Sequence, residues 1–414
     1  MAQKTVAILG TFDTKGEEFA FVKRLFEQRG IGTLTIHCGV YDPTFEPDVS
    51  NAQVADAAGA DIDEIVSRGD RALGTSTMAH GVKRLVPQLY ADGRFDGIFS
   101  MGGSGGTSIA TAAMQELPVG VPKVMVSTMA SGDTTPYVGA ADIDMFPSIV
   151  DVSGVNSISM TIFGNAVNAM VGMLSNEVPA ESDVRPLVAL TMFGVTTPCV
   201  TKAQELLEER GYETLVFHAT GTGGKCMEAL VRGGFVRGVL DITTTEWCDE
   251  LFGGVLAAGP HRNEAAALCG VPAVVSVGAM DMVNFGPWDT VPERNRDRNL
   301  YRHNPTVTLM RTTADENRQL GSKLAEKVNM STGPCAVMLP LRGVSMIDAP
   351  GQPFYGPEED AALFDAVREG VDRSRAELVE VDAHVNDDAF AQAAVDKLCE
   401  LMALDRSRDG GARG

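Results

Sequence analysis

The sequence has little of what a metal site, a disulfide framework or a nucleic-acid-binding surface would need. Its 414 residues include only six His and seven Cys. The cysteines are scattered and form no C-x-x-C pair, which favours reduced thiols over disulfides or zinc. Basic residues are also few, because 34 Lys and Arg stand against 55 Asp and Glu, a net charge of −21. Such a surface repels phosphate backbones and anionic headgroups, so we expect neither nucleic acid nor membrane as a partner.

One uncharged stretch, Val152 to Asn176, is long enough to raise the question of a membrane span. Its Asn, Ser and Gly residues make it too polar for that role. We interpret it as a helix buried inside the protein or at a subunit interface, which favours a homo-oligomer. The N-terminus lacks the apolar core and cleavage site of a signal peptide. Together with the reduced cysteines, this predicts a cytoplasmic protein.

The chain repeats itself in a way that indicates two α/β domains. Residues 5–37 and 187–218 each read as a strand, a glycine-bearing turn, an amphipathic helix and a second strand that ends in His. The similarity continues in two further pairs of segments, 94–103 with 235–244 and 120–128 with 270–278. Strands that alternate with helices and consist of short apolar runs indicate parallel sheets covered on both faces.

We therefore predict an α/β fold of two Rossmann-like domains with mainly parallel sheets, from an internal duplication. The predicted boundaries are 1–180 for the first domain, with an insert at 42–76 over the edge of its sheet, a linker near 176–186, 187–405 for the second domain and 406–414 for a tail. Residues 279–305 are predicted to be irregular, because they are rich in Pro, Asn and Arg.

The first candidate binding segment is Thr11–Lys15, between a predicted strand and a predicted helix. Open α/β sheets bind ligands at such junctions, where free backbone N–H groups and the helix dipole favour an anion. Lys15 adds a positive charge, Thr14 can cap the helix, and Asp13 can hold a metal or a ligand hydroxyl. The alternative is an ordinary helix start beside a solvated lysine.

A glycine-rich turn gives the stronger signal. The strand FDGIFS is followed by MGGSGGTS, which opens another predicted helix. Closely spaced glycines let a ligand approach the backbone and permit positive φ, and the hydroxyls add donors. A turn without a ligand would rarely need so many glycines, so we predict ligand contact. The predicted contacts are Gly102, Gly103, Ser104, Gly105, Gly106 and Thr107.

A third polar loop follows the strand PKVMVS. Its hydroxyls, glycine and one carboxylate stand where a buried strand ends, and in a doubly wound sheet this end should neighbour the other two loops. A solvated loop is the alternative. The predicted contacts here are Ser127, Thr128, Ser131 and Gly132, and Asp133 joins Asp13 and Lys15 as a candidate catalytic residue.

The second half contains a different set of candidates. Arg262, Arg311 and Arg342 stand near predicted element ends, and Arg side chains suit carboxylate or phosphate ligands. With Asp281 and His303 they form a candidate pocket for an anionic substrate. Salt bridges to the many acidic residues are the alternative for each Arg.

Several long motifs resemble one known family. They are GTFDTKGEE, MGGSGGTSIA, STMASGDT and, in the second half, MVNFGP, HNPTVTLMRTT and PLRGVSMIDAPGQPFYGPEED. The family is the Tm-one-like ATP-binding family, which shares the amino-terminal half of the tomato tobamovirus-resistance protein. The resemblance implies two Rossmann-like subdomains with ATP in the first. It implies ATP near Thr11, Asp13 and Lys15, the loop 102–107 and the loop Ser127–Asp133.

These observations predict a cytosolic ATP-binding protein, an enzyme that acts on a small anionic metabolite in a cleft between the domains. Lys15 would stabilise phosphate charge, and Asp13 or Asp133 would hold Mg²⁺ or act as a base. Two alternatives stay open. One is a nucleotide-independent lyase or hydrolase of a sugar acid or small carboxylate, and the other is a scaffold or regulatory protein that binds ATP without turnover.

Overall fold

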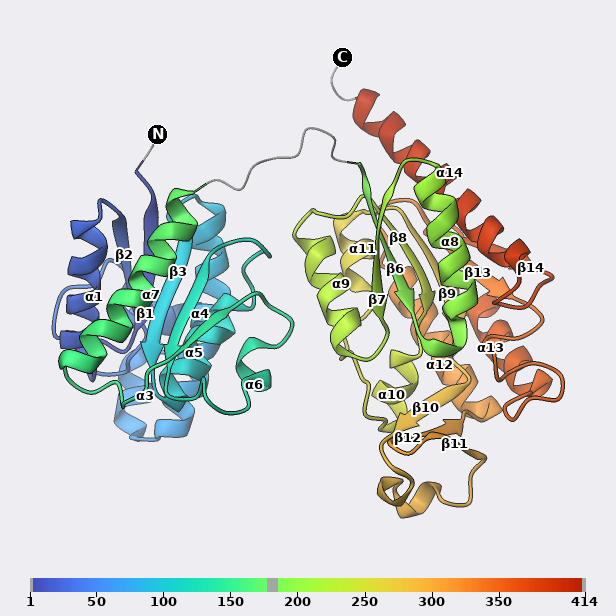
Figure 1. Cartoon of the computed structure of the whole chain (residues 1–414), viewed down its shortest axis with the longest axis horizontal. Helices are drawn as coiled ribbons and strands as arrows, with labels where there is room; N and C mark the ends of the chain where they lie inside the picture. The colour runs from blue at the N-terminus through green and yellow to red at the C-terminus, as the bar shows by residue number, and fades with distance from the viewer. Residues whose placement is uncertain (1–2, 177–184, 412–414) are drawn as a thin grey trace. The chain divides into compact units, whose positions relative to one another are not determined.

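The computed structural model describes residues 3–176 and 185–411, except for the side chains of 406–411. The chain divides into two compact units, Met1–Glu181 and Ser182–Gly414, called here the first unit and the second unit (Figure 1). Most of the predicted linker near 176–186 lies outside the described residues, as do the last residues of the predicted tail, 412–414.

The first unit is built on a parallel sheet with the strand order β2-β1-β3-β4-β5. Strands β3 and β4 are buried along their whole length, as expected for a sheet covered on both faces. Helices α1 and α7 pack on one face and α4 and α5 on the other (Figure 1). The elements are β1 (Thr5–Gly10), α1 (Gly16–Gln28), β2 (Gly32–His37), α2 (Asn51–Ala57), α3 (Ile62–Arg68), α4 (Arg71–Ala91), β3 (Gly97–Gly102), α5 (Ser104–Met114), β4 (Lys123–Ser127), α6 (Thr135–Val138), β5 (Asp144–Pro147) and α7 (Ser157–Ser175).

The segment 42–76 contributes three helix starts to the first unit. Ser50 begins α2 with a capping box to Gln53, Asp61 begins α3, and Asp70 begins α4. Each cap oxygen satisfies backbone N–H groups that have no partner inside the helix. The connection from β2 to β3 therefore contains three helices, α2, α3 and α4. The second unit has a single helix between its corresponding second and third strands.

Helix α7 is the uncharged stretch noted in the sequence. It is long and apolar enough to cross a membrane by length and composition, and 33% of its most apolar window is buried. The side chains of Phe163, Val167 and Met170 are fully or almost fully buried in the core that α7 shares with α1 and the sheet. One face of this helix therefore belongs to the core of the first unit.

The second unit repeats the same winding and extends it. Its sheet has the order β14-β13-β9-β8-β6-β7. Its first strand, β6, lies between the second and third strands of the unit, β7 and β8, just as β1 lies between β2 and β3. The repeat seen in the sequence is matched in register, because Gly10 pairs with His37 and Met192 pairs with His218. Both orders are that of the doubly wound, flavodoxin-type sheet. The predicted fold class, two Rossmann-like α/β domains with mainly parallel sheets, is confirmed.

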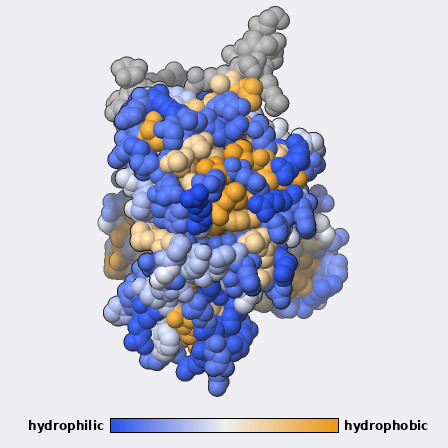
Figure 2. All heavy atoms as spheres, turned by 90° about the vertical axis from the view of Figure 1, so that its right-hand side faces the viewer, coloured by the Kyte–Doolittle hydropathy of each residue, from blue (hydrophilic) through white to orange (hydrophobic). Residues whose placement is uncertain are grey.

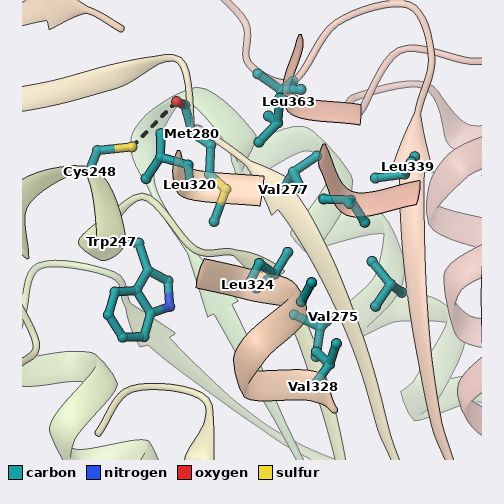
Figure 3. Packing of buried hydrophobic residues seen from close by; sticks show 14 of the residues in the cluster. Trp247, Cys248, Val275, Val277, Met280, Leu320, Leu324, Val328, Leu339 and Leu363 are labelled. Atoms are coloured by element: carbon teal, nitrogen blue, oxygen red, sulfur yellow. Dashed lines mark hydrogen bonds between the residues drawn. The ribbon is translucent and has the colours of Figure 1, made fainter. Parts of the chain in front are cut away.

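Helices α8 and α14 cover one face of the second sheet, and α9, α11, α12 and α13 lie on the other. Trp247, Val275 and Leu324 belong to the core on that second face (Figure 3), where the Cys248 thiol donates to the Met280 carbonyl at 3.3 Å. The parallel sheet and its helices comprise β6 (Leu187–Met192), α8 (Thr197–Glu209), β7 (Glu213–His218), α9 (Thr222–Arg232), β8 (Gly238–Thr243), α10 (Glu246–Phe252), α11 (Glu264–Cys269), β9 (Ala273–Gly278), α12 (Ala314–Val328), β13 (Cys335–Pro340), α13 (Pro357–Gly370), β14 (Glu377–Val381) and α14 (Asp388–Gly411).

The range 279–305 differs from its prediction as irregular. It contains β10 (Met282–Phe285) and β11 (Leu300–Asn304), which pair with β12 (Val307–Arg311) in an antiparallel sheet of order β10-β12-β11. The prolines that suggested a loop lie between these short strands, whereas Asn284 and Asn304 lie within them. Figure 2 looks onto the α13 and α14 side of this unit, where apolar side chains gather amid a mostly hydrophilic surface.

Candidate functional site

A pocket of about 530 Å³ opens in the first unit where β1 and β3 end. The helices that follow these two strands, α1 and α5, lie on opposite faces of the sheet, so this is the switch point at which doubly wound sheets bind ligands. The pocket brings the Thr11–Lys15 turn and the glycine turn together. It is lined by Thr11, Asp13, Thr14, Lys15, Cys38, Gly39, Val40, Tyr41, Ile65, Val66, Gly69, Asp70, Arg71, Gly74, Thr75, Met78, Gly103, Ser104, Gly105, Gly106, Ile109 and Asp151.

The start of α5 presents free backbone donors to this pocket. The first hydrogen bond of the helix runs from the Thr107 N–H to the Gly103 carbonyl, at 2.9 Å. No side chain caps the helix, and the N–H groups of Ser104, Gly105 and Gly106 have no acceptor among the residues that the structure describes. Such a group of N–H donors at a helix start favours an anion.

The glycines of this turn are not explained by backbone conformation, because none of them has a positive φ. The expectation of positive φ here was wrong. Packing explains Gly102, where an added Cβ would lie 3.3 Å from the Gly106 Cα. It does not explain Gly105, because an added Cβ there would meet nothing within 4 Å, and at Gly103 the nearest atom would be the Thr128 hydroxyl at 3.8 Å. These two positions leave room for a molecule beyond the fold itself.

Buried hydroxyls hold the glycine turn to the end of β4. The Thr107 Oγ1 donates to the Gly103 carbonyl at 2.8 Å and lies 2.7 Å from the Ser127 Oγ. The Ser127 Oγ also accepts from the Met129 N–H at 2.9 Å. Thr107 and Ser127, both predicted ligand contacts, are fully buried and do not line the pocket. They stabilise the turn from its buried side, away from the pocket.

The rest of the third loop lies apart from this pocket. Ser131, Gly132 and Asp133 are exposed and do not line it. The Asp133 carboxylate accepts from the Thr135 N–H at 3.0 Å, and hydrogen bonds from the Thr135 side chain and N–H lower the pKa of Asp133. Asp133 thus lies in an exposed turn just before the short helix α6, which is the solvated-loop alternative given for this segment.

His37 and Asp13 fix the other wall. The buried His37 Nδ1 accepts from the Phe12 N–H at 3.1 Å and the Gly39 N–H at 3.3 Å, and its Nε2 lies 2.9 Å from the Tyr41 carbonyl. Because Nδ1 accepts, the ring proton sits on Nε2. Asp13 accepts from the Thr14 N–H at 2.8 Å and the Tyr41 N–H at 3.2 Å. Both side chains therefore hold the two turns that follow β1 and β2.

Two cationic side chains reach the pocket. The Lys15 Nζ donates to the Val152 carbonyl, which is a neutral acceptor. Arg71, the first residue of α4, is exposed and forms no ion pair with the described part of the chain. An ammonium and a guanidinium without carboxylate partners are available to an anionic ligand.

The other end of the pocket is apolar. Val40, Ile65, Met78 and Ile109 line it, and Cys38 adds a buried thiol. Burial raises the pKa of Cys38, with Asp13 as a second cause, so this thiol stays protonated. No sequence motif pointed to this half of the pocket, to Arg71 or to Asp151. The only signal for Arg71 was its place directly after a helix cap in the segment expected to cover the sheet edge.

The turn Gly102–Gly106 also fits the G-x-S-x-G pattern of a nucleophile elbow. The structure does not give Ser104 that role. Ser104 has no positive φ, and no His is among the residues that line the pocket. A serine without a base in reach is not activated for attack.

In the second unit, Arg262 is a buried structural residue and not an accessible substrate contact. It is 1% exposed and forms a bidentate pair with Asp241, at 2.6 and 2.7 Å. It also donates to Glu246, and Glu228 lies 3.5 Å away. The neighbouring carboxylates hold the pKa of Arg262 well above its usual range, against the effect of burial. The prediction of a substrate role is wrong for this residue, because its donors are already used.

The other second-unit candidates do not form one site either. Arg311 is 6% exposed and donates to the Phe354 carbonyl and to Asp360, both at 2.8 Å. Arg342 lies on the surface in a bidentate pair with Asp382, at 2.7 Å for each bond. The ion-pair alternative thus describes all three arginines, His303 is exposed on β11, and Asp281 is fully buried beside Ser345.

The second unit fills the position that the first leaves open. When the alignment of the repeat 94–103 with 235–244 is extended, Glu246 is the residue equivalent to Gly105. The Glu246 Oε1 accepts from the Gly221 N–H at 2.8 Å and the Gly224 N–H at 3.2 Å, at the start of α9. The hydroxyls of Thr196 and Thr243 close the crevice between β6 and β8 at 2.8 Å. This unit carries its own anion at a helix start.

Within the described ranges, no three His, Cys, Asp or Glu side chains are grouped as a metal site would require. The geometry thus defines a two-domain α/β protein with one open switch-point pocket, in the first unit. The chain belongs to the uncharacterised protein family UPF0261, whose N-terminal domain matches residues 4–179 and whose C-terminal domain matches residues 185–402.

Similar proteins span bacteria and plants. A UPF0261 protein of Clostridium tetani is 51% identical over 400 residues, 96% of this chain and 99% of that protein. The tomato ToMV resistance protein Tm-1 is 38% identical over 424 residues, which cover 97% of this chain and 56% of the tomato protein. The solved UDP-GlcNAc 2-epimerase of Methanocaldococcus jannaschii is 10% identical with a TM-score of 0.23, over 66% of this chain and 83% of that one, which is too low to carry an argument.

Proposed function

We propose that the first unit binds a nucleoside triphosphate, with its phosphates at the start of α5. One observation carries the proposal. The N–H groups of Ser104, Gly105 and Gly106 have no acceptor in the described structure, and Gly105 is required neither by φ nor by packing. Polyphosphates bind to donors of this kind without a basic surface, which suits a chain of charge −21.

The two ends of the pocket match the two ends of a nucleotide. Lys15, Arg71 and the α5 start form a polar end, and Val40, Ile65 and Met78 form an apolar end that suits a base. A volume of about 530 Å³ is in the range of small-molecule and cofactor sites. The choice of ATP among the nucleotides comes from the family resemblance of the motifs.

Magnesium fits this pocket as a companion of the phosphates. Mg²⁺ is usually bound by one or two carboxylates together with phosphate oxygens and water. Asp13 lines the pocket, and each of its carboxylate oxygens accepts one backbone hydrogen bond. In this proposal Asp13 holds the metal and Lys15 stabilises phosphate charge.

Calorimetric titration with ATP and Mg²⁺ tests the proposal. Gly105→Val places side-chain atoms in the open space of the pocket, so we expect unchanged stability and an ATP affinity reduced more than about tenfold, that is by more than about 1.4 kcal/mol. Gly164→Val is the matched control, because Gly164 on α7 also has nothing within 4 Å of an added Cβ. Equal ATP affinity in the two variants would contradict the proposal.

Whether the bound nucleotide is turned over decides between an enzyme and a regulatory protein. We favour an enzyme that acts on a small anionic metabolite, and the release of ADP from ATP with candidate metabolites tests this. ATP held for hours without ADP release would support the scaffold or regulatory alternative. The nucleotide-independent lyase or hydrolase has less support, because Arg262 and Arg311 are buried in internal ion pairs.

We also propose a cytoplasmic homo-oligomer. No disulfide joins the cysteines of the described residues, as expected in a reducing compartment. Helix α7 leaves Ile158 and Met160 49% and 44% exposed, and an exposed apolar face favours association. Sedimentation of the purified chain tests the oligomeric state.

A further inference from the structure

A turn beside the pocket is held in a conformation that its residue type disfavours. Ile149 has a φ of 64°, and the Val150 N–H donates to the Ser148 carbonyl at 2.7 Å, which closes a tight turn around it. A β-branched residue in this region is a conformational outlier with a strained backbone. The Ile149 side chain is 71% exposed, so packing of this side chain does not compensate for the cost.

The segment that follows this turn reaches the pocket. Asp151 lines the pocket wall, and its carboxylate accepts no hydrogen bond from the residues that the structure describes. The next residue, Val152, is fully buried, and its carbonyl accepts a hydrogen bond from the Lys15 Nζ. Lys15 therefore connects the start of α1 to the segment Ser148–Gly154, across the polar end of the pocket.

An anionic ligand changes both ends of this connection. An ammonium gains more from a phosphate than from a neutral carbonyl, because hydrogen bonds between two charged groups are stronger. The same phosphate repels the Asp151 carboxylate, which lies on the same wall. Both effects act to release the segment from its position against Lys15.

We propose that Lys15 is a ligand-operated latch: an anion in the pocket takes Lys15 from the Val152 carbonyl and lets the strained turn at Ile149 relax. The inference rests on the proposed function, since it needs a phosphate ligand in this pocket. It adds that ligand binding is reported by a defined segment, Ser148–Gly154. The relaxation of the turn contributes to affinity, because the free protein bears a conformational cost that the bound protein loses.

Hydrogen exchange of the whole chain tests the latch, with ATP–Mg²⁺ and with pyrophosphate as probes. We expect slower exchange of the amides at 103–107 and at least about threefold faster exchange at 148–154 when either probe is bound. In Lys15→Met, exchange at 148–154 should be fast already without a probe and should respond little to it. Lys23→Met is the control, because Lys23 lies on the same helix, pairs with Glu27 and does not line this pocket.

A second variant separates the latch from a merely structural turn. Ile149→Gly removes the cost of positive φ in the free protein, so we expect ATP affinity to fall about threefold to tenfold although the residue does not line the pocket. Protection at 103–107 without any change at 148–154 would overturn the latch and leave the proposed function standing. Absence of protection at both segments, with no heat of binding, would overturn the proposed function and the latch together. Unchanged affinity in Ile149→Gly would overturn the contribution of the turn.

Discussion

Gly39 lies against the carboxylate of Asp13 so closely that an added Cβ would fall 2.2 Å from its Oδ1. The two residues come from the turns after β2 and β1, and the contact lets Asp13 reach the Tyr41 N–H. The wall of the pocket is therefore set by a glycine that lies outside every motif recognised in the sequence.

The first prediction concerns this contact. Gly39→Ala should destabilise the first unit by about 1–3 kcal/mol, because the new methyl group must displace the Asp13 carboxylate or the turn. It should also weaken ATP binding, since both turns line the pocket. Urea unfolding followed by circular dichroism measures the first effect. Gly164→Ala, in open space within α7, should leave ATP affinity unchanged and should not lower stability, because alanine favours a helix interior over glycine. A Gly39→Ala protein as stable as the parent would show that the contact is not restrictive.

The second prediction concerns Arg71. Arg71→Gln should reduce ATP affinity about fivefold to thirtyfold, because a charge-assisted hydrogen bond to phosphate contributes roughly 1–2 kcal/mol. Its stability should stay within about 0.5 kcal/mol of the parent, because Arg71 is exposed and has no ion pair in the described structure. Arg84→Gln, an exposed position further along α4, is the control in the same titration. Equal affinities of the two variants would remove Arg71 from the site.

The third prediction separates the buried from the exposed arginine. Arg262→Ala leaves Asp241 and Glu246 buried without their counter-charge, which should cost about 3–5 kcal/mol. Arg342→Ala breaks the surface pair with Asp382, for which we expect no more than about 1 kcal/mol. Both tryptophans of the chain, Trp247 and Trp288, belong to the second unit, so their fluorescence during urea unfolding reports on both variants. Similar losses in the two variants would contradict the structural role assigned to Arg262.

The fourth prediction concerns pH. Burial, with repulsion from Asp348, raises the pKa of Asp281 to about 7 and that of Asp360 to about 8, against the opposing effect of Arg311. The folded chain thus keeps protons that the unfolded chain, with a carboxyl pKa of 3.8, has lost. Stability from these groups is fully present below about pH 4 and is lost as the pH rises through 7 and 8.

Tryptophan-monitored unfolding between pH 5 and pH 9 measures this slope, whose ceiling is about 1.4 kcal/mol per pH unit for each carboxyl. Asp281→Asn should flatten it, because an amide oxygen can still accept from the Ser345 hydroxyl, now 2.7 Å from Asp281, without titrating. A slope that is the same in parent and variant would show that Asp281 is ionised throughout.

The fold was predictable because the spacing of apolar residues and the residue types at turns are local properties of the sequence. Apolar runs such as β3 and β4, followed by glycine turns and amphipathic helices, indicated two doubly wound sheets, and the meeting of the Thr11–Lys15 turn with the glycine turn follows from parallel winding. Arg71 and Val40 were missed because their place in the pocket depends on the path of the insert, which no local pattern sets.

The second-unit arginines failed for a related reason. An Arg near a strand end looks the same in sequence whether it meets a ligand or a buried carboxylate. Asp241 and Glu246 reach Arg262 from 21 and 16 residues away, and this pairing depends on tertiary structure alone. The antiparallel strands β10 and β11 were missed for the same reason. Each is defined by its pairing with β12, which is a tertiary contact and leaves no local sequence pattern.

The carboxylate of Glu246 at the start of α9 gives the second half of the chain a permanent internal substitute for a bound anion. In the described part of the first half no side chain caps the start of α5, so the ligand proposed for that site would stabilise the amino-terminal half against unfolding and leave its counterpart unaffected. Under that proposal, removal of the ligand would expose the amino-terminal half to proteolytic cleavage before the carboxy-terminal half.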